Sequence, residues 1–455
     1  MPSKIENITY SASEIKRQIR IVCTNAEFDA LENEWTKLFD QSDVTVFQSY
    51  EWLRTWWKYF AKPNFKLNIL VFYHNNQIEG IAPLFLETLK IAGLPLARRL
   101  QFLGRGLSDY VNFIILPGFE DYIFERFTNY LASSAPFWNL FDIEDVNEDT
   151  RLVQRFPHFI EKHGLRLFKF QGNICPQVML PESPDLLIES MGQTSGHNFK
   201  RKVKKLQNNF QTSIDVYKHE TDDFQKAIDE FSEIHGSRWK SLGHPSAFDC
   251  PAHKEFHVEF SNKFARRGWL RLYILRVNNK PVAASFGFYF NKRIYMYQSN
   301  ASGSDEVMRC SPGLFLRSIA MSDGIKQGME VFDYMRGDES YKFSEWDVTI
   351  RKNYLLRVKP NKVSRSPGFF LYLVYELGGK ACIRIQREYY EYRRFLITKP
   401  RTIGDRLKYI FSILGKLNRL GFNFVFRHLP IKTLIKSELK KDLPCAKQNN
   451  NEVLK

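Results

Sequence analysis

The sequence predicts an α+β protein made of two copies of one unit, each a mixed sheet flanked by helices, followed by a basic helical tail. Short apolar runs of strand length alternate with amphipathic helical segments through most of the chain. Landmarks of this pattern recur at nearly one spacing, which is typical of a duplicated unit. The pairs are Asn75-Asn76 with Asn278-Asn279, Trp35 with Trp239, and Phe47 with Phe248, which lie 203, 204 and 201 positions apart.

The chain is long enough for two or three domains, and its composition excludes a disordered protein. Of its 455 residues, 44% are hydrophobic and 15% are aromatic. The formal net charge of +16 is unevenly spread: residues 351–455 contain 24 Lys and Arg against 7 Asp and Glu, whereas residues 1–350 contain 42 against 43. The basic character therefore belongs to the tail, and what the tail binds need not be the substrate.

The cysteine pattern and the N-terminus predict a reduced, cytoplasmic protein of bacterial type. The six cysteines form no C-x-x-C pair and lack the spacing of zinc ligands with histidine, so we expect no metal site. The N-terminal segment lacks the apolar core of a signal peptide, and the chain has no uncharged apolar run long enough to span a bilayer. A peripheral position at the inner face of the plasma membrane stays open.

The first copy is expected to run from a strand through two helices into a hairpin, and then through further strands and helices. The adjacent asparagines at 75 and 76 are the expected hairpin turn. The predicted elements are strands at 18–23, 67–73, 78–87, 100–103, 111–116 and 138–143, and helices at 27–39, 47–60, 122–131 and 150–163.

The second copy repeats this order after a basic helix at 194–210. That helix carries Lys200, Arg201, Lys202, Lys204 and Lys205, and it either holds a phosphorylated substrate or carrier or presents an ordinary solvated face. We place the domain boundaries at 18–180, 181–358 and 359–455. The predicted strands are 214–217, 270–277, 282–290, 294–297 and 331–334. The predicted helices are 224–239, 251–266 and a third helix that ends at about 327.

Residues able to carry chemistry cluster just after the last of these strands. Asp338 and Glu339 are adjacent carboxylates; partial burial would raise their pKa values, so they are the candidate bases, and Tyr341 is the candidate acid. Lys342 would stabilise negative charge on the acceptor or on the tetrahedral intermediate, and Arg336 would position an anionic substrate group. The alternative is a charged surface loop that follows a core strand.

Residues around this cluster resemble, in their order and spacing, the GNAT acyltransferase superfamily. More narrowly, they resemble the CelD-like branch of acetyltransferases of cellulose and exopolysaccharide biosynthesis, which is related to the Fem peptidyltransferases. The resemblance covers roughly residues 20–350. The matching residues are His235, Arg238-Trp239, Gly243, Ala247-Phe248, Pro281-Val282-Ala283, Ser311-Pro312-Gly313, Phe332-Asp333, Gly337-Asp338-Glu339 and Tyr341-Lys342.

The resemblance implies transfer of an acyl group from acetyl-CoA or another acyl-CoA to an amine, with no nucleophilic cysteine and no metal. The donor phosphates would lie at residues 302–313, where backbone N–H groups meet a helix N-terminus. This segment departs from the usual Arg/Gln-x-x-Gly-x-Gly/Ala pattern, and an ordinary strand-to-helix loop is the alternative. The residues assigned to the donor are Ser302, Gly303, Arg309, Ser311 and Gly313.

Acceptor contacts are predicted in both copies. His235 is assigned as a base or an acceptor-binding group, and Asp109 is expected to bind the amine or a sugar hydroxyl across a cleft between the copies. Asp333 is expected to have a structural role. Because the first copy lacks a phosphate loop, we expect it to be catalytically silent and to shape the acceptor site. The residues assigned to the substrate are Asp109, Tyr110, Arg238, Trp239 and Arg336.

The tail at 359–441 contains an amphipathic basic stretch at 406–426 that suits an anionic membrane surface. A helical cap on the enzyme and a partner-binding segment are the alternatives. Nucleic acid is disfavoured for so apolar a segment, although transfer RNA stays open.

The function expected from these observations is N-acyl transfer to a small-molecule or carrier-linked amine, on an amino sugar or another precursor of cell-envelope polysaccharide. The polysaccharide context comes only from the resemblance. The alternatives are Fem-type transfer of an amino acid from aminoacyl-tRNA, and a catalytically inactive scaffold in an envelope-synthesis complex.

Overall fold

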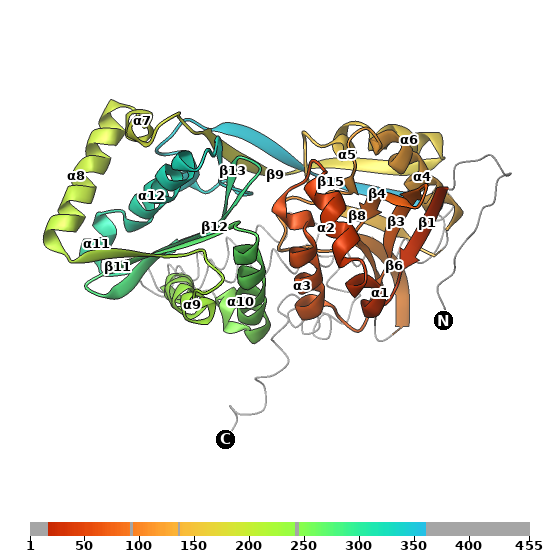
Figure 1. The fold of residues 1–455 in the computed structure, drawn as a ribbon, viewed down its shortest axis with the longest axis horizontal. Helices are drawn as coiled ribbons and strands as arrows, with labels where there is room; N and C mark the ends of the chain where they lie inside the picture. Colours follow the sequence, from red (N-terminus) through yellow and green to blue (C-terminus); the bar gives the residue numbers. More distant parts are fainter. Residues whose placement is uncertain (1–16, 92–93, 135–136, 242–244, 361–455) are drawn as a thin grey trace, which may run out of the picture.

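The computed structural model describes residues 17–91, 94–134, 137–241 and 245–360. Within them the chain forms two lobes that lie side by side (Figure 1). The first lobe contains the elements from β1 to β8 with helices α1 to α6, and the second contains β10 to β14 with helices α7 to α12. Two long strands, β9 and β15, run across both lobes. The predicted tail lies outside the described residues.

The sheets explain how the lobes are joined. In the described part of the chain, eleven strands form one sheet in the order β10-β11-β12-β13-β14-β9-β15-β8-β6-β5-β2, and β1-β3-β4-β7 form a second sheet. The strands are β1 (Arg17–Val22), β2 (Phe65–Leu67), β3 (Ile69–His74), β4 (Gln77–Ala82), β5 (Leu84–Ile91), β6 (Leu94–Phe102), β7 (Ile114–Ile115), β8 (Leu140–Asn147), β9 (Leu165–Met179), β10 (Thr212–Tyr217), β11 (Leu270–Val277), β12 (Lys280–Phe290), β13 (Arg293–Ala301), β14 (Val331–Asp333) and β15 (Thr349–Pro360).

Local sequence signals account for several helix starts. Thr24 accepts a hydrogen bond from the backbone of Glu27 at the start of α1, and Ser49 accepts one from the backbone of Trp52 at the start of α3. Pro184, Pro251 and Pro312 stand in the first turns of α7, α10 and α12, where a missing N–H costs nothing. The helices are α1 (Asn25–Asp29), α2 (Glu32–Asp40), α3 (Tyr50–Phe60), α4 (Glu120–Ser133), α5 (Arg151–Gln154), α6 (Phe156–Lys162), α7 (Pro184–Glu189), α8 (Gln193–Asn209), α9 (Phe224–Ser241), α10 (Pro251–Arg266), α11 (Asp305–Arg309) and α12 (Pro312–Lys326), with 3-10 turns η1 (Val46–Gln48), η2 (Ala247–Asp249) and η3 (Ser340–Lys342).

The two lobes repeat the predicted hairpin in nearly identical form. Asn75 and Asn76, between β3 and β4, have φ angles of 50° and 64°, and Asn278 and Asn279, between β11 and β12, have φ angles of 49° and 64°. Two successive residues with positive φ make the turn that fits the twist of a tight hairpin. The prediction of an α+β protein with two copies of one unit is confirmed.

The crossing strands make the lobes share hydrogen bonds. β9 pairs with β14 at its end, from Gln177 to Met179, and with β15 over most of its length. β15, which follows the second copy in the sequence, also pairs with β8 of the first lobe. The chain therefore returns to the first lobe after completing the second, and the boundaries at 180/181 and 358/359 stay predictions.

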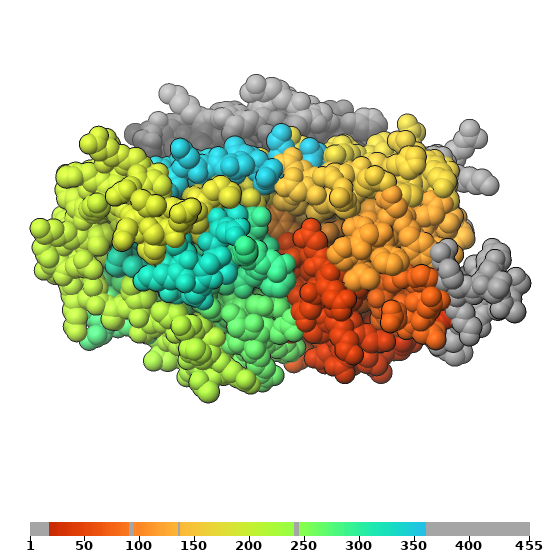
Figure 2. Space-filling model, turned by 45° about the horizontal axis from the view of Figure 1, so that its top comes forward, coloured from red at the N-terminus to blue at the C-terminus, as the bar shows by residue number. Residues whose placement is uncertain are grey.

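Aromatic side chains fill the contact between the lobes. The ring of Trp52 on α3 lies 5.1 Å from that of Phe256 and 5.0 Å from that of Phe260, both on α10. Figure 2 shows the surfaces of these two regions in direct contact, red against green. Because one apolar core continues across the seam, we expect the lobes to move little against each other.

Among the described residues, no helix combines the length and the apolar character needed to cross a bilayer. The same residues contain no group of three or more His, Cys, Asp or Glu side chains arranged to hold a metal ion.

Candidate active site

β13 and β14 separate in the middle of the second lobe. They are parallel and pair from Arg293 with Val331 to Tyr295 with Asp333. β14 ends at Asp333, whereas β13 continues to Ala301, so the two chains diverge beyond that point. The two strands therefore form a V, with Tyr295 and Asp333 at its vertex. Unpaired backbone groups along such an opening can bind an extended ligand.

A bulge on β13 lies directly beside the vertex. The register with β12 shifts between Phe286 and Phe288, so that Gly287 faces two residues of β13. A methyl group at Gly287 would lie 2.7 Å from the carbonyl oxygen of Tyr295, which explains why a residue without a side chain stands here. The bulge bends β13 at the point where it leaves β14.

The N-terminus of α12 lies at the open end of the V. A methyl group at Gly313 would be 3.6 Å from the Cβ atom of Ala301, the last residue of β13. Of the predicted donor residues, Ser302, Ser311 and Gly313 are partly exposed, and Gly303 and Arg309 are exposed. The Arg309 side chain donates a hydrogen bond to the carbonyl of Asp305 in its own helix, α11.

The basic helix α8 reaches this same point. Lys202 donates a hydrogen bond of 3.0 Å to the hydroxyl of Ser311, the residue that precedes α12. The other basic residues of α8 are exposed: Lys200, Arg201, Lys204 and Lys205. A helix N-terminus, a hydroxyl and an ammonium group together form a suitable environment for phosphate. The sequence alone does not indicate that Lys202 and Ser311 are neighbours, because they lie 109 positions apart.

Arg336, which was assigned to the substrate, instead ties the lobes together. Its Nε atom lies 2.7 Å from Oδ1 of Asp109, its guanidinium also pairs with Asp145, and Nη2 donates to the carbonyl of Gly106 at 2.8 Å. Asp109 is therefore occupied by an arginine in this structure. Burial raises the pKa of Asp109 to about 6, against the opposing influence of Arg336.

Lys342 also supports the loop. It is almost fully buried, and its ammonium group donates to the carbonyl of Arg336 at 2.7 Å and pairs with Glu339 at 2.9 Å. These contacts hold the chain immediately after β14 in place. Lys342 thus lies beside the V, and its charge is already partly compensated by Glu339.

The carboxylates Asp338 and Glu339 are exposed, so the expectation of partial burial is wrong. The reason is that the turn at Gly337, whose φ is 126°, directs the chain outwards. Tyr341 is partly buried, and the guanidinium of Arg317 lies 4.8 Å from its ring centre. Burial, with Glu339 adding to it, raises the pKa of Tyr341 to about 12, so this phenol keeps its proton at neutral pH.

The His235 side chain is buried and paired. Nδ1 lies 2.7 Å from the hydroxyl of Ser246, and the ring lies 5.1 Å from that of Phe248 and 5.7 Å from that of Trp239. Burial lowers the pKa of His235 to about 4, so the ring is neutral near pH 7. Arg238 and Trp239 are exposed at the end of the same helix.

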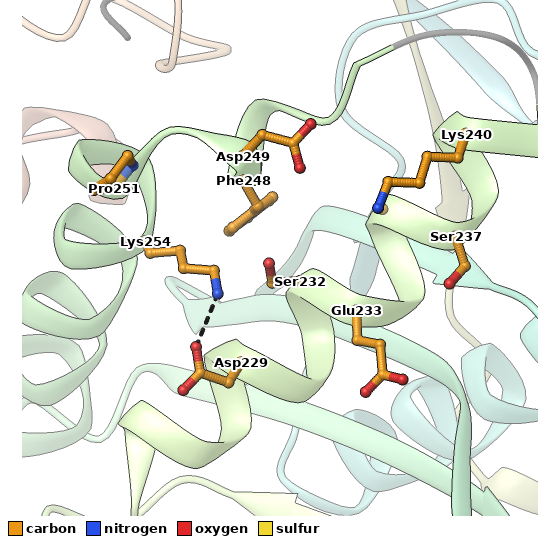
Figure 3. Close-up of a pocket in the computed structure, with 10 residues that line it drawn as sticks. Asp229, Ser232, Glu233, Ser237, Lys240, Phe248, Asp249, Pro251 and Lys254 are labelled. Carbon is orange, nitrogen blue, oxygen red and sulfur yellow. Dashed lines mark hydrogen bonds and ion pairs between the residues drawn. The ribbon is translucent and has the colours of Figure 1, made fainter. Parts of the chain in front are cut away.

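Beside this helix lies a cavity of about 470 Å³ between α9 and the start of α10 (Figure 3). Phe248 lines it together with Asp229 and Lys254, which form an ion pair of 3.0 Å. His235, Arg238 and Trp239 are not among the residues that line it. The structure therefore does not place these three predicted residues in this cavity.

A larger cavity, which we call the seam cavity, lies where the two lobes meet. Its volume is about 690 Å³, and Tyr295 and Asp333 at the vertex of the V both line it. The Asp333 carboxylate accepts hydrogen bonds from the hydroxyl of Tyr110 at 2.9 Å, from the side-chain amide of Gln177 at 3.0 Å and from the backbone N–H of Met335 at 2.8 Å. Tyr110, which was assigned to the substrate, therefore reaches the vertex from the first lobe.

Comparisons with known proteins agree with this geometry. Residues 195–343, from α8 to the end of η3, match the family model described as an acetyltransferase (GNAT) domain. This match confirms the prediction of a GNAT-type acyltransferase. A comparison with curated proteins gave no match.

Among solved structures, the crystal structure of FemX has the same overall fold, with a TM-score of 0.51 at 11% identity, covering 74% of this chain and 96% of that chain. A conserved protein of unknown function from Bacteroides thetaiotaomicron VPI-5482 gives 0.46 at 13% identity, covering 74% and 99%. A tandem GNAT protein from the clavulanic acid biosynthesis pathway gives 0.36 at 10% identity, covering 74% and 98%.

Proposed function

We propose that this GNAT-type enzyme transfers an acyl group, most simply acetyl, from acyl-CoA to a primary amine on an amino sugar or a related precursor of cell-envelope polysaccharide. The observation that carries the acyl-CoA part is the V between β13 and β14, whose vertex lies at Tyr295 and Asp333 and whose open end lies at the start of α12. An extended thioester fits such an opening, because its phosphates can lie at a helix N-terminus while its carbonyl lies near the vertex.

The residues present fit the donor. Ser311 and Gly313 border the start of α12, and Lys202 adds a positive charge within hydrogen-bonding distance of Ser311. In the transfer, the amine nitrogen attacks the thioester carbonyl, the carbon–sulfur bond breaks, the nitrogen loses a proton and the thiolate gains one. Tyr341 is the proposed proton donor, since its phenol is protonated at neutral pH and follows the V along the chain.

The proposed roles of the other predicted residues follow from their surroundings. Lys342 and Arg336 hold the loop that borders the V, and Arg336 does so through Asp109. Asp338 and Glu339 remain candidate bases that act from the exposed side of this loop. His235 is proposed as a neutral, buried group that positions α9 against Ser246.

The polysaccharide context and the CelD-like branch are supported only by the residues of this chain that resemble that branch. A cytoplasmic enzyme that contacts the membrane through residues 359–441 would suit a carrier-linked acceptor, and this too is part of the proposal.

Acyl-CoA binding tests the proposal directly. Acetyl-CoA and longer acyl-CoAs should raise the melting temperature of the full chain, because a ligand at about 100 times its Kd adds about 2.7 kcal/mol to the stability. S-acetylpantetheine, which lacks the nucleotide and its phosphates, is the matched control and should produce a smaller shift. Release of free CoA in the presence of an amine then measures turnover. The absence of any shift with every acyl-CoA would contradict the proposal.

A second candidate is Fem-type transfer from aminoacyl-tRNA, which is favoured by the exposed basic residues of α8 and by the fold shared with FemX. A charged tRNA should then bind with an affinity that falls steeply as salt is added. Binding of charged tRNA without binding of acyl-CoA would favour this candidate. If neither donor binds, the remaining candidate is a catalytically inactive scaffold in an envelope-synthesis complex.

A further inference from the structure

In the first lobe the eleven-stranded sheet has two faces, and helices α4 and α6 pack on one of them. On that face the ring of Phe141, in β8, lies 5.4 Å from the ring of Phe127, in α4. We call the opposite face of this part of the sheet the outer face. Side chains paired directly across neighbouring strands share a face, as do alternate residues along one strand. The register therefore assigns these apolar side chains to the outer face: Leu89, Ala97, Leu140, Phe168, Phe170 and Leu355.

Three of these side chains form a small cluster at one end of the outer face. Leu89, Ala97 and Leu140 are 3%, 5% and 5% exposed, and they are separate from the three larger cores of the described residues. The cluster contains no residue of a described helix. Three side chains on one sheet face are too few to bury one another, so this end of the face needs a cover.

An exposed aromatic pair continues the apolar surface on β9. Phe168 and Phe170 are 37% and 48% exposed, and Leu355 on β15 lies directly opposite Phe170. The cationic groups of Arg166 and Lys359 lie 5.5 Å and 5.7 Å from the ring centre of Phe168. Neighbouring aromatic rings that stay exposed on a sheet are typical of an interaction surface.

The charged groups of the outer face pair with one another. Asp142 accepts a hydrogen bond of 3.0 Å from Arg357 and lies 3.4 Å from Arg99, which also pairs with Glu87 at 2.7 Å. These pairs neutralise the band between the small cluster and the aromatic pair. A segment that covers this face therefore needs apolar side chains, and it gains little from charges of either sign.

The chain itself leaves the sheet beside the small cluster. Val358 pairs with Phe141, so β15 ends at Pro360 next to Leu140. The next three strands from β15 are β8, β6 and β5, which carry Leu140, Ala97 and Leu89. At about 4.8 Å per strand the cluster extends about 14 Å from β15. Five extended residues span about 17 Å, so the chain can cross the whole cluster from residue 366 onwards.

The segment that begins there has the composition that such a cover requires. Residues 361–455 contain 20 Lys and Arg against 7 Asp and Glu, yet residues 366–375, with the sequence SPGFFLYLVY, contain no charged residue. This is the longest uncharged run after Pro360, and its last seven residues are all aromatic or aliphatic. So apolar a run is costly to leave in water, and the nearest apolar surface along the chain is the outer face.

We propose that residues 366–375 of the same chain lie against the outer face, over the small cluster and beside Phe168 and Phe170. The start of the tail is then part of the fold, and the basic stretch at 406–426 is left for membrane contact. Because β8 also carries Asp145, a partner of Arg336, this segment supports the strand that holds the loop after β14. The proposal does not depend on acyl transfer.

Photo-crosslinking of the full chain tests the contact. With p-benzoylphenylalanine in place of Phe168, irradiation should capture the tryptic peptide 366–380. The same analogue in place of Phe343, a side chain of similar exposure at 38% in the second lobe, is the control and should not capture this peptide. Heavy-isotope and light-isotope chains are mixed before irradiation, and captured pairs of one isotope show contact within a single chain.

Three outcomes of this experiment would overturn the proposal. Captured pairs of mixed isotopes would assign the outer face to a second copy of the chain. Capture of lipid instead of the peptide, in the presence of phosphatidylethanolamine and phosphatidylglycerol vesicles, would assign it to the membrane. Capture of other peptides, or none, would show that residues 366–375 do not lie there.

Charges introduced into the tail locate the segment. Phe370→Asp with Leu371→Asp should lower capture by the analogue at position 168 about tenfold, because carboxylates without partners are costly to bury. The same variant should exchange amide hydrogens faster in peptides that cover β6 and β8. Ile410→Asp with Phe411→Asp, an equally apolar pair in the basic stretch, is the matched control and should change neither measurement. If both double variants behave alike, the assignment of residues 366–375 is wrong.

Discussion

The two lobes share a hairpin with the same turn geometry but differ in the strand that follows it. In the second lobe, β12 is followed by β13, which runs from Arg293 to Ala301 and pairs with both β12 and β14. In the first lobe, β4 pairs with β7, which is only Ile114–Ile115. The first lobe also contains a parallel pair, β6 with β8, which joins Arg99 with Leu140 through Gln101 with Asp142, but β6 ends one residue later, at Phe102.

This difference agrees with the proposal that the donor binds in the second lobe. Such a V needs a strand that continues past its parallel pairing: β13 continues for six residues beyond Tyr295, whereas β6 continues for only one beyond Gln101. The first lobe instead supplies Asp109 and Tyr110, which reach Arg336 and Asp333 across the seam. The first lobe thus shares the hairpin turn of the second, and its contacts across the seam hold the end of β14 and the loop that follows it.

The largest effect is expected where the lobes are tied together. Arg336→Ala would leave Asp109 and Asp145 buried without a cation, so the free energy of unfolding should fall by about 3–5 kcal/mol. Denaturant unfolding measures it. The control is Arg155→Ala, whose partner Asp121 is on the surface and whose loss should cost about 1 kcal/mol or less. Equal losses in the two variants would show that the first lobe does not stabilise the loop after β14.

Matched glycines in the two lobes test the opening itself. Gly287→Ala places a methyl group 2.7 Å from a backbone oxygen at the bulge of β13, and should cost about 1–3 kcal/mol of stability and weaken acyl-CoA binding. Gly80→Ala in β4 places its methyl group 2.9 Å from Cδ1 of the Ile123 side chain, which can rotate more easily than a backbone oxygen can move, so it should cost less and leave acyl-CoA binding unchanged. Acyl-CoA binding that is unaffected by Gly287→Ala would argue against a donor at the vertex.

Features that depend on neighbouring residues could be predicted from the sequence, and features that depend on distant pairing could not. The Asn-Asn turns and the helices that begin at Pro251 and Pro312 were predicted because each signal is local. The position at which β13 and β14 part depends on the sheet register, which no local pattern specifies. The strand β15 was missed because its sequence alternates only weakly, and its pairing with β8 and β9 fixes it.

The same distinction applies to the site. The Gly-Asp-Glu sequence correctly indicated the loop after β14. It did not indicate how deeply each side chain of this loop is buried: Asp338 and Glu339 are exposed. Arg336 contacts residues 191 and 227 positions away, so no spacing in the sequence could have indicated that its charge is used within the protein. Tyr295 was visible only as one of two tyrosines alternating with apolar residues on a strand.

Burial of His235 in the second lobe should make the stability of the protein fall in acid. His235 has a pKa of about 4 when folded, below its ordinary value of 6.5, because burial disfavours its charge; Asp249 opposes this, and His253 and Arg238 add to it. Below pH 6.5 the unfolded chain therefore binds a proton that the folded chain does not, and stability falls until about pH 4.

For this one group the loss at pH 5 is about 2 kcal/mol relative to pH 7. His235→Gln should therefore lose less stability than the parent chain between these two pH values, as measured by denaturant unfolding. His158→Gln, an exposed position in the first lobe, should change nothing. The same acid loss in the parent chain and in His235→Gln would show that this ring is not buried as a neutral group.

The smallest effect is expected at the open end of the V, where Lys202 approaches Ser311. Lys202→Ala should weaken acyl-CoA binding by about tenfold, because a hydrogen bond from a charged group contributes about 1.5–3 kcal/mol and partial exposure reduces it. Lys204→Ala, on the same helix but exposed, should change the affinity by less than about twofold. The comparison is made with acetyl-CoA by calorimetry, and S-acetylpantetheine should show no difference between the variants. If both lysines contribute equally to the affinity for acetyl-CoA, α8 acts as a diffuse basic surface. The second lobe would then bind its donor without a defined phosphate contact from this helix.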